Sequence, residues 1–259
     1  MQTIGYITGY LDLPQVLLYL FWAFFFGLIY YLVLEGHREG FPMESESMGR
    51  AVVTGWPIPE PKTYKLAGGK SVTIPELSRP EPQYNARSTA ASPGSPIEPI
   101  GNPMLAGVGS GAYAMRADVP DMTSHGTPLI QPLRVLPQHG VAHQDVDPRG
   151  LPVMGGDGKP GGVVRDIWLD TAEFMFRFLE VEVAGKGANA PTRRVLLPIP
   201  FARIRRNMVE VNSIYGMHFA DVPGTRHPEQ VTMLEEEKIS AYYGAGTLYA
   251  DPKRIEAII

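Results

Sequence analysis

The sequence contains no cysteine, which excludes disulfides, thiolate zinc sites, iron–sulfur clusters and cysteine nucleophiles. It also has no excess of positive charge, because 23 basic residues against 27 acidic residues give a formal net charge of −4. Nucleic-acid binding depends on a basic surface, so no nucleic-acid partner is expected. Lysine and arginine are absent from residues 1–37, so the chain does not begin with the basic segment typical of a signal peptide.

Motifs for catalysis and ligand binding are missing as well. The sequence has no Gly-x-Ser-x-Gly elbow and no His-Glu-x-x-His pair. The glycine-rich residues 107–111 follow no expected strand and precede no expected helix, so they indicate a turn and not a phosphate loop. Asp145 and Asp147 begin a pattern similar to a calcium loop, but Arg149 occupies a ligand position. We therefore expect neither an enzyme nor a metal site.

One long apolar run is present near the N-terminus. Residues 13–34 contain no charged side chain, and about 20 such residues are needed to cross a bilayer as a helix. Pro14 suits the first turn of a helix, and Asp12 is a candidate N-cap. We predict a transmembrane helix over residues 13–35, preceded by a short segment, residues 1–12. A buried helix of a soluble protein is less favoured because the run is apolar on all faces.

The orientation of this helix follows from the first basic residue. Arg38 comes directly after the apolar run, and the lysines at 62, 65 and 70 belong to the polar part that follows. Basic residues collect on the cytoplasmic side of membrane proteins. The N-terminus is therefore expected in the periplasm of a bacterial inner membrane, and the rest of the chain in the cytoplasm.

Residues 36–150 are rich in proline and have few periodic stretches. Of the 25 prolines, 18 fall between Pro42 and Pro160, which disfavours helices and suits extended chain. Disorder is one interpretation. Aromatic anchors favour a second, an extended cytoplasmic segment that packs on partner subunits; they are Trp56, Tyr64, Tyr84 and Tyr113.

Residues 151–259 show the pattern of short β-strands. Apolar and acidic residues alternate in residues 179–183, as in a half-buried strand. Further strands are expected at 163–169, 194–199 and 208–214, and their spacing predicts a small barrel or sandwich. A helix is expected near 231–243, with Gly244 as its terminator.

One polar cluster has a candidate function. Asp166, Asp170, Glu173 and Arg177 surround a turn that also contains bulky apolar side chains at 174–176. A carboxylate beside such groups can exchange protons near neutral pH. The alternative is an ordinary acidic turn with an Asp–Arg ion pair, which the spacing alone favours.

Several ordered blocks resemble the H (heavy) subunit of purple-bacterial photosynthetic reaction centres. The first is Phe21-Trp-Ala-Phe-Phe-Phe-Gly-Leu-Ile-Tyr-Tyr-Leu32, followed by Arg38-Glu-Gly-Phe-Pro42. The later blocks are Gly101-Asn-Pro-Met104, Asp147-Pro-Arg-Gly-Leu-Pro152, Arg177-Phe-Leu-Glu-Val-Glu182, Val195-Leu-Leu-Pro198 and Val231-Thr-Met-Leu-Glu-Glu-Glu-Lys-Ile-Ser-Ala-Tyr-Tyr243. Together these blocks span nearly the whole chain.

The resemblance implies a single N-terminal transmembrane helix and a cytoplasmic, mainly-β domain of the photosynthetic reaction-centre barrel type with one short C-terminal helix. It implies a subunit that caps the cytoplasmic face of the L and M subunits, stabilises them and helps conduct protons to the secondary quinone. Bacteriochlorophyll, bacteriopheophytin, quinones, carotenoid and non-haem iron are then expected on L and M, and none on this chain alone. The expected location is the photosynthetic intracytoplasmic membrane, with light-harvesting antenna nearby and membrane lipids in contact.

The resemblance also implies roles for single residues. Glu173 matches the carboxylate nearest the quinone site, and Asp170 matches an acid of the same polar network. Arg177 and Met175 fall in the same block. His125 aligns with a histidine at the surface where protons are taken up. Thr127 occupies the position of a second histidine. We therefore expect no two-histidine metal site, and Asp121 is a further candidate for proton uptake.

Two other classes of function remain as alternatives. The chain could be a membrane-tethered adaptor whose β-barrel binds a regulatory partner, since barrels of this type occur outside photosynthesis. It could also be a membrane-anchored enzyme, which the missing nucleophile–base pair disfavours. Copurification with bacteriochlorophyll-bearing subunits would separate the expected function from both.

Overall fold

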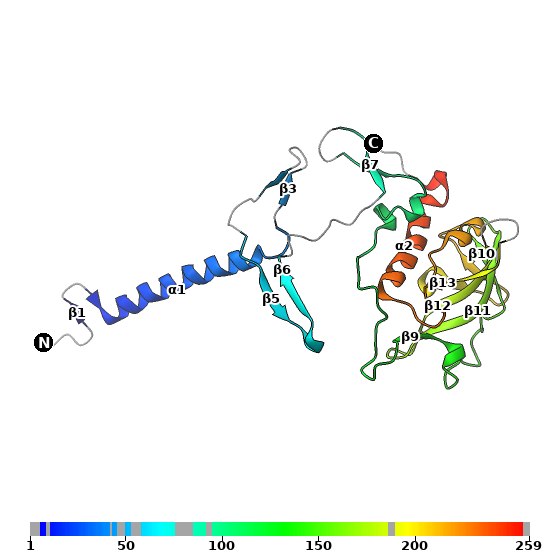
Figure 1. Ribbon diagram of the computed structural model, residues 1–259, viewed down its shortest axis with the longest axis horizontal. Coiled ribbons are helices and arrows are strands. Elements are labelled where there is room, and N and C mark those ends of the chain that lie inside the picture. Colours follow the sequence, from blue (N-terminus) through cyan, green and yellow to red (C-terminus); the bar gives the residue numbers. More distant parts are fainter. Residues whose placement is uncertain are drawn as a thin grey trace. The chain divides into compact units, whose positions relative to one another are not determined.

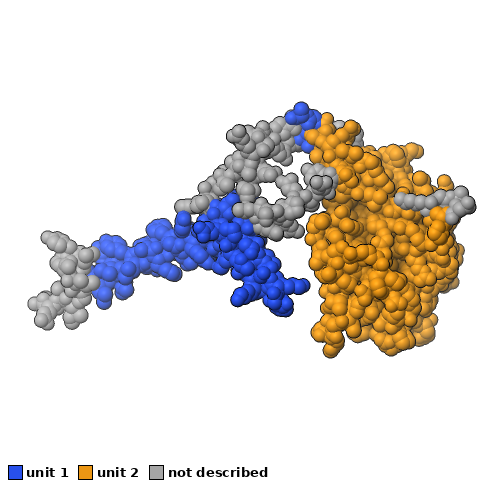
Figure 2. Space-filling model, in the orientation of Figure 1, with its two compact units in different colours: residues 1–81, 90–95 blue, residues 82–89, 96–259 orange. Residues whose placement is uncertain are grey.

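The chain divides into two compact units. The computed structural model describes residues 6–8, 11–41, 43–45, 50–52, 58–75, 85–91, 95–185 and 190–255. Unit 1 comprises residues 1–81 and 90–95, and unit 2 comprises residues 82–89 and 96–259 (Figure 2).

Unit 1 is dominated by the helix α1 (Leu13–Gly36), which ends one residue beyond the predicted segment. Asp12 caps it, because its carboxylate accepts a hydrogen bond from the backbone N–H of Gln15 at 2.8 Å. None of its residues is buried within the chain, so its apolar side chains face outward on all sides. Within the described residues α1 is the one helix with the length and composition to cross a membrane.

Short antiparallel hairpins make up the strands of unit 1. The first joins β1 (Tyr6–Thr8) to β2 (Leu11–Asp12) ahead of α1. After α1 come the hairpins of β3 (Met43–Ser45) with β4 (Arg50–Val52), and of β5 (Lys62–Lys65) with β6 (Ser71–Ile74). The turn between β5 and β6 contains the 3₁₀ segment Ala67–Gly69, where Gly68 and Gly69 adopt positive φ angles.

Unit 2 is built on one seven-stranded sheet, with the order β13-β12-β11-β10-β15-β14 and with β9 paired to β11 (Figure 1). The pairs are antiparallel except that β10 runs parallel to β15. The strands are β9 (Ile130–Pro132), β10 (Pro152–Gly155), β11 (Pro160–Asp170), β12 (Met175–Val183), β13 (Arg193–Pro198), β14 (Arg203–Ile204) and β15 (Val209–Val211). In the described part of the chain no pairing joins β13 to β14, so the hydrogen-bonded sheet is open.

The hydrophobic core of unit 2 lies between this sheet and the helix α2 (Met233–Tyr249), which runs alongside it (Figure 1). Leu179, Val181 and Val183 of β12 are buried, as their alternation in the sequence predicts, but Glu180 between them is buried as well, because it is paired with two arginines and an indole, so the strand is not half-buried there. The largest fully buried side chains include Trp168 of β11 and Tyr242 of α2. The β-rich domain and the C-terminal helix are therefore both confirmed.

The predicted end of the C-terminal helix is wrong. The helix α2 begins at Met233, where Thr232 and Glu235 form a capping box, and it continues past Gly244 to Tyr249. The reason is tertiary packing: a Cβ at Gly244 would lie 3.1 Å from the Ser110 carbonyl oxygen, and one at Gly246 would lie 2.3 Å from Cγ2 of Ile214. The two glycines thus permit close contacts of α2 with residue 110 and with the loop at 213–214, and neither ends the helix.

The second half of residues 36–150 packs on the chain's own sheet and helix, which the sequence did not predict; packing on partner subunits stays a prediction. The short hairpin β7 (Ala86–Ser88) and β8 (Ile97–Pro99) leads into the 3₁₀ segments Pro103–Leu105 and Gly109–Gly111, which contact α2. Met104, Val108, Ile130 and Leu133 are buried. Among the expected anchors, Trp56 and Tyr84 lie outside the described residues.

We predict that Gly246→Ala destabilises unit 2 by about 2 kcal/mol, because the added methyl overpacks the contact between α2 and residues 213–214. Gly244→Ala is the matched control: its Cβ would meet one atom, the Ser110 carbonyl oxygen at 3.1 Å. That contact is offset by a gain in helix propensity of about 1 kcal/mol. Urea unfolding followed by circular dichroism measures both, and equal midpoints would contradict the argument.

Candidate functional site

The turn between β11 and β12, residues 171–174, is shaped by a buried carboxylate. Asp170 is 3% exposed, and its Oδ1 accepts hydrogen bonds from the backbone N–H groups of Ala172 and Glu173, both at 3.0 Å. Thr171 donates its N–H and its hydroxyl to the carbonyl oxygen of Leu129, each at 3.0 Å. The turn is therefore held from both sides, by Asp170 inside it and by residue 129 beside it.

The tip of this turn carries exposed side chains of mixed character. Phe174 adopts a positive φ of 53°, unusual for a residue with a side chain, and it is 71% exposed. Glu173 and Arg177 are exposed on either side of it, and Met175 is exposed as well. Arg177 donates to the sulfur of Met175 at 3.9 Å. Large exposed apolar groups beside a carboxylate and a guanidinium are typical of a surface that a partner covers.

A groove of about 290 Å³ adjoins this turn, between the start of β12 and the first turns of α2. Its polar side chains are Arg177 from β12 and Glu236 and Ser240 from α2. The remaining lining is apolar: Met175, Phe176, Phe178, Pro198, Ile199 and Pro200. The groove therefore sets one carboxyl group and one guanidinium in a largely apolar wall.

Burial in this groove raises the pKa of Glu236 from its ordinary value of 4.5 to about 7. The charges of Arg177 and Arg116 oppose that increase, while the charges of Asp121 and Glu237 add to it. A carboxyl group with this pKa can take up and release a proton under physiological conditions.

Sequence reasoning missed Glu236. It lies in a run of three glutamates, residues 235–237, and the three have different surroundings. Glu235 is buried in the capping box with Thr232, and Glu237 forms an ion pair with Arg116 at 3.7 Å. A helical wheel separates the directions of three neighbouring glutamates, but it does not show what each direction faces in the fold. The sequence therefore could not indicate that Glu236 is the one in an apolar groove.

The two candidates for proton uptake lie on a separate loop. Asp121 and His125 are both exposed, and Asp121 accepts a hydrogen bond from the N–H of Met122 at 2.9 Å. Thr127 pairs with Thr123 through their hydroxyl groups at 2.7 Å. Asp121 is nevertheless near enough to raise the pKa of Glu236. In the described ranges no three histidine, aspartate or glutamate side chains gather as a metal site would require.

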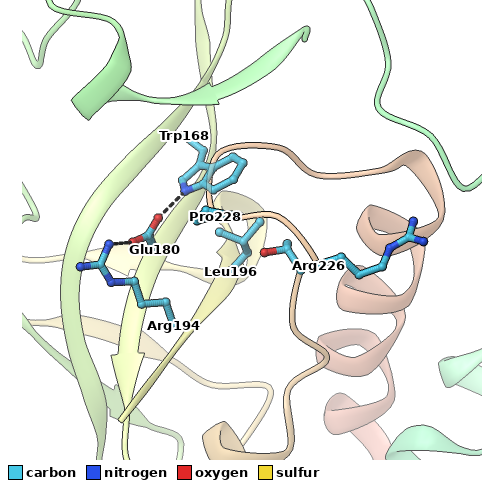
Figure 3. Close-up of a pocket in the computed structure, with 7 residues that line it drawn as sticks. Trp168, Glu180, Arg194, Leu196, Arg226 and Pro228 are labelled. Carbon is cyan, nitrogen blue, oxygen red and sulfur yellow. Dashed lines mark hydrogen bonds and ion pairs between the residues drawn. The ribbon is translucent and has the colours of Figure 1, made fainter.

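A second cavity, of about 250 Å³, contains the buried carboxylate of Glu180 (Figure 3). Glu180 accepts hydrogen bonds from Arg134 and Arg194, both at 2.7 Å, and from the indole N–H of Trp168 at 2.9 Å. Arg134 also pairs with Asp166 at 3.1 Å. Figure 3 shows the guanidinium of Arg226 pointing away from Glu180. The charged groups around Glu180 are already paired with one another. This cluster therefore joins neighbouring strands of the sheet and offers no free group for chemistry.

Comparison with known families agrees with this architecture. A model of the photosynthetic reaction centre H-chain N-terminal region matches residues 5–135. The chain belongs to the reaction-centre H-chain family. A PRC-barrel domain model matches residues 141–218 of this H chain, which confirms the fold class expected from the sequence.

Membership of the family has direct consequences for this H chain. It is a subunit of a photosynthetic reaction centre and associates with the L and M subunits. The family is a structural subunit of the reaction centre, which fits cofactors being carried by other subunits. The apolar α1 fits a membrane-anchored subunit.

We predict that Glu180→Ala lowers the free energy of unfolding by about 3 kcal/mol, because it removes the acceptor of the buried indole N–H and of Arg194, and one of the acceptors of Arg134. Glu182→Ala on the same strand is the control. It removes the ion pair with the half-exposed Arg165 and an exposed hydrogen bond from the Thr192 hydroxyl, which together contribute about 1 kcal/mol. Urea unfolding of the two variants compares them, and equal losses would show that Glu180 is not central to the fold.

We predict that Glu236→Gln becomes increasingly stabilising as the pH rises from 4.5 to 7. Across this window the unfolded chain has released the proton of Glu236 while the folded chain still holds it. The stability of the native protein therefore falls with pH by this contribution, and glutamine removes it. Glu173→Gln, at an exposed position of the β11–β12 turn, should show no such trend. Unfolding curves at several pH values provide the test, and parallel pH profiles for both variants would contradict the raised pKa.

Proposed function

We propose that this H chain caps the cytoplasmic face of the L and M subunits, stabilises the complex and conducts protons to the secondary quinone. The observation that carries the proton-transfer part is the groove in which Arg177 and Glu236 face one another beside the turn of Glu173. The groups that would carry protons thus come from β12, α2 and the β11–β12 turn.

The chemistry of quinone reduction requires such groups. A doubly reduced quinone in an apolar pocket carries a charge that is very costly to bury, so protons must accompany the electrons. Glu173 lies at the exposed tip of the turn, where a carboxylate can reach a partner subunit. Asp170 holds that tip in place through two backbone N–H groups. Arg177 supplies a positive charge that stabilises the ionised form of Glu236.

Proton uptake is proposed to begin at the loop of Asp121 and His125. Both side chains are exposed to water, and Asp121 influences the charge state of Glu236. A proton taken up at this loop can therefore change the proton affinity of Glu236, and through it the supply to Glu173. Met175 and Phe174 supply exposed apolar surface for the contact with L and M.

The finer topology of the chain is part of the same proposal. The N-terminus lies in the periplasm, α1 crosses the photosynthetic intracytoplasmic membrane, and the body lies in the cytoplasm, with antenna and lipids as neighbours. Residues 36–81 then lie on the partner subunits or on the membrane surface, because few of their described side chains are buried within unit 1. Bacteriochlorophyll, bacteriopheophytin, quinones, carotenoid and non-haem iron belong to L and M.

We predict that Glu173→Gln slows the flash-induced second electron transfer to the secondary quinone by about tenfold, while the first electron transfer is unchanged. The reason is that this second step consumes a proton, and glutamine cannot supply one. Glu210→Gln on β15 is the control, since Glu210 is paired with Arg205 away from the turn. Transient absorption of complexes purified with their pigments measures both rates. An unchanged second rate would make this chain a scaffold and place the relay on its partners.

A further inference from the structure

The hairpin of β5 and β6 is the first basic element after the membrane helix. Residues 61–75 contain three lysines, Lys62, Lys65 and Lys70, and no acidic residue. The whole chain has an excess of acidic residues and a negative net charge, whereas the net charge of this segment is positive. Its strands are exposed along almost their entire length.

A buried arginine ties this hairpin to the end of α1. Arg38 is 8% exposed although it lies only two residues past the helix. Its Nη1 donates to the carbonyl oxygen of Glu60 at 2.6 Å and to that of Ile74 at 3.0 Å. Those two oxygens flank the two open ends of the hairpin, and the same guanidinium pairs with Glu35 at 2.8 Å. The hairpin therefore starts and ends at the same level as the cytoplasmic end of the apolar helix.

The two faces of the hairpin differ in chemistry. Tyr64 and Val72 are directly opposite one another in the register and are 37% and 40% exposed. The ammonium group of Lys62 lies 5.5 Å from the ring centre of Tyr64, so it is on this same face. The other face contains the hydroxyl pair of Thr63 and Thr73, at 2.8 Å. One face is therefore largely apolar with one lysine, Lys62, and the other is polar and contains Lys65, which is opposite Ser71 in the register.

We propose that the β5–β6 hairpin binds the anionic headgroups of membrane phospholipids, with its lysines on the phosphates and Tyr64 and Val72 at the boundary with the acyl chains. Three features favour a lipid surface as the occupant. The charge of the hairpin is complementary to anionic lipid, tyrosine is suited to the membrane interface, and Arg38 holds the hairpin next to the membrane-spanning helix. The inference rests on the membrane anchoring of the chain and is independent of proton transfer.

The absence of cysteine from the chain makes a direct test possible, because a single introduced thiol can be labelled. The full chain would be prepared with Val72→Cys or, for the opposite face, Ser71→Cys, and labelled with an environment-sensitive fluorophore. It would be reconstituted in nanodiscs of phosphatidylcholine with or without phosphatidylglycerol, and again as the complex with L and M. Quenching by lipids with brominated acyl chains reports contact with the membrane.

The expected result is quenching at position 72 that depends on phosphatidylglycerol, and much weaker quenching at position 71. Each lysine near an anionic surface contributes about fivefold to binding. The triple variant Lys62→Gln, Lys65→Gln, Lys70→Gln should therefore lower the ratio of bound to free hairpin on the order of 100-fold. The control variant Lys159→Gln, Lys238→Gln, Lys253→Gln makes the same change of charge in unit 2 and should leave the ratio unchanged.

Two outcomes would overturn the proposal. In one, position 72 stays exposed to water in every lipid mixture and becomes protected only when L and M are present; the hairpin then binds a protein. In the other, quenching is equal with and without phosphatidylglycerol, so that charge has no part in it. If the triple variant does not fold, raising the salt concentration to about 1 M on the native sequence screens the same charges and should release the probe.

Discussion

The buried carboxylate of Glu180 is the interaction on which unit 2 depends. It lies in the middle of β12 and binds Trp168 of β11, Arg194 of β13 and Arg134 beside β9. A single ionised group thus connects four segments that lie far apart in the sequence. Burying one charge would be very unfavourable, and two guanidinium groups and an indole N–H make it tolerable. Because all the partners are directional donors, they also fix the register of three neighbouring strands.

The candidate site lies at the other end of the same strands, β11 and β12. The strands β11 and β12 leave the Glu180 cluster and meet at the turn of Asp170 and Glu173, so rigid strands present the turn. The groove beside it requires the first turns of α2 to lie beside the start of β12. Arg177 and Glu236 are far apart in sequence and come together only through this packing. The raised pKa of Glu236 is therefore a consequence of packing.

In unit 1 a single arginine has a comparable role. Arg38 is the first basic side chain of the sequence, and in the sequence analysis only its positive charge mattered, because it predicted the orientation of the helix. In the structure the same side chain is buried and bonds two carbonyl oxygens of a hairpin that begins more than 20 residues later. Arg38 therefore fixes the open end of the hairpin, where Lys62 lies, at the end of α1.

The amino-acid sequence by itself determined the apolar helix, the strands of the β-rich domain and the family. An uncharged run predicts the helix, period-two alternation predicts the strands, and the ordered sequence blocks indicate the family. Asp170 and Glu173 could be placed at a turn for the same reason. Only the tertiary structure decided that α2 continues through two glycines and that Met104, Ile130, Leu133 and Leu136 belong to the core. It alone singled out Glu236 from its glutamate neighbours. These features depend on which surfaces of the folded chain approach one another. Local sequence patterns do not predict burial or charge pairing between residues that are distant in the sequence.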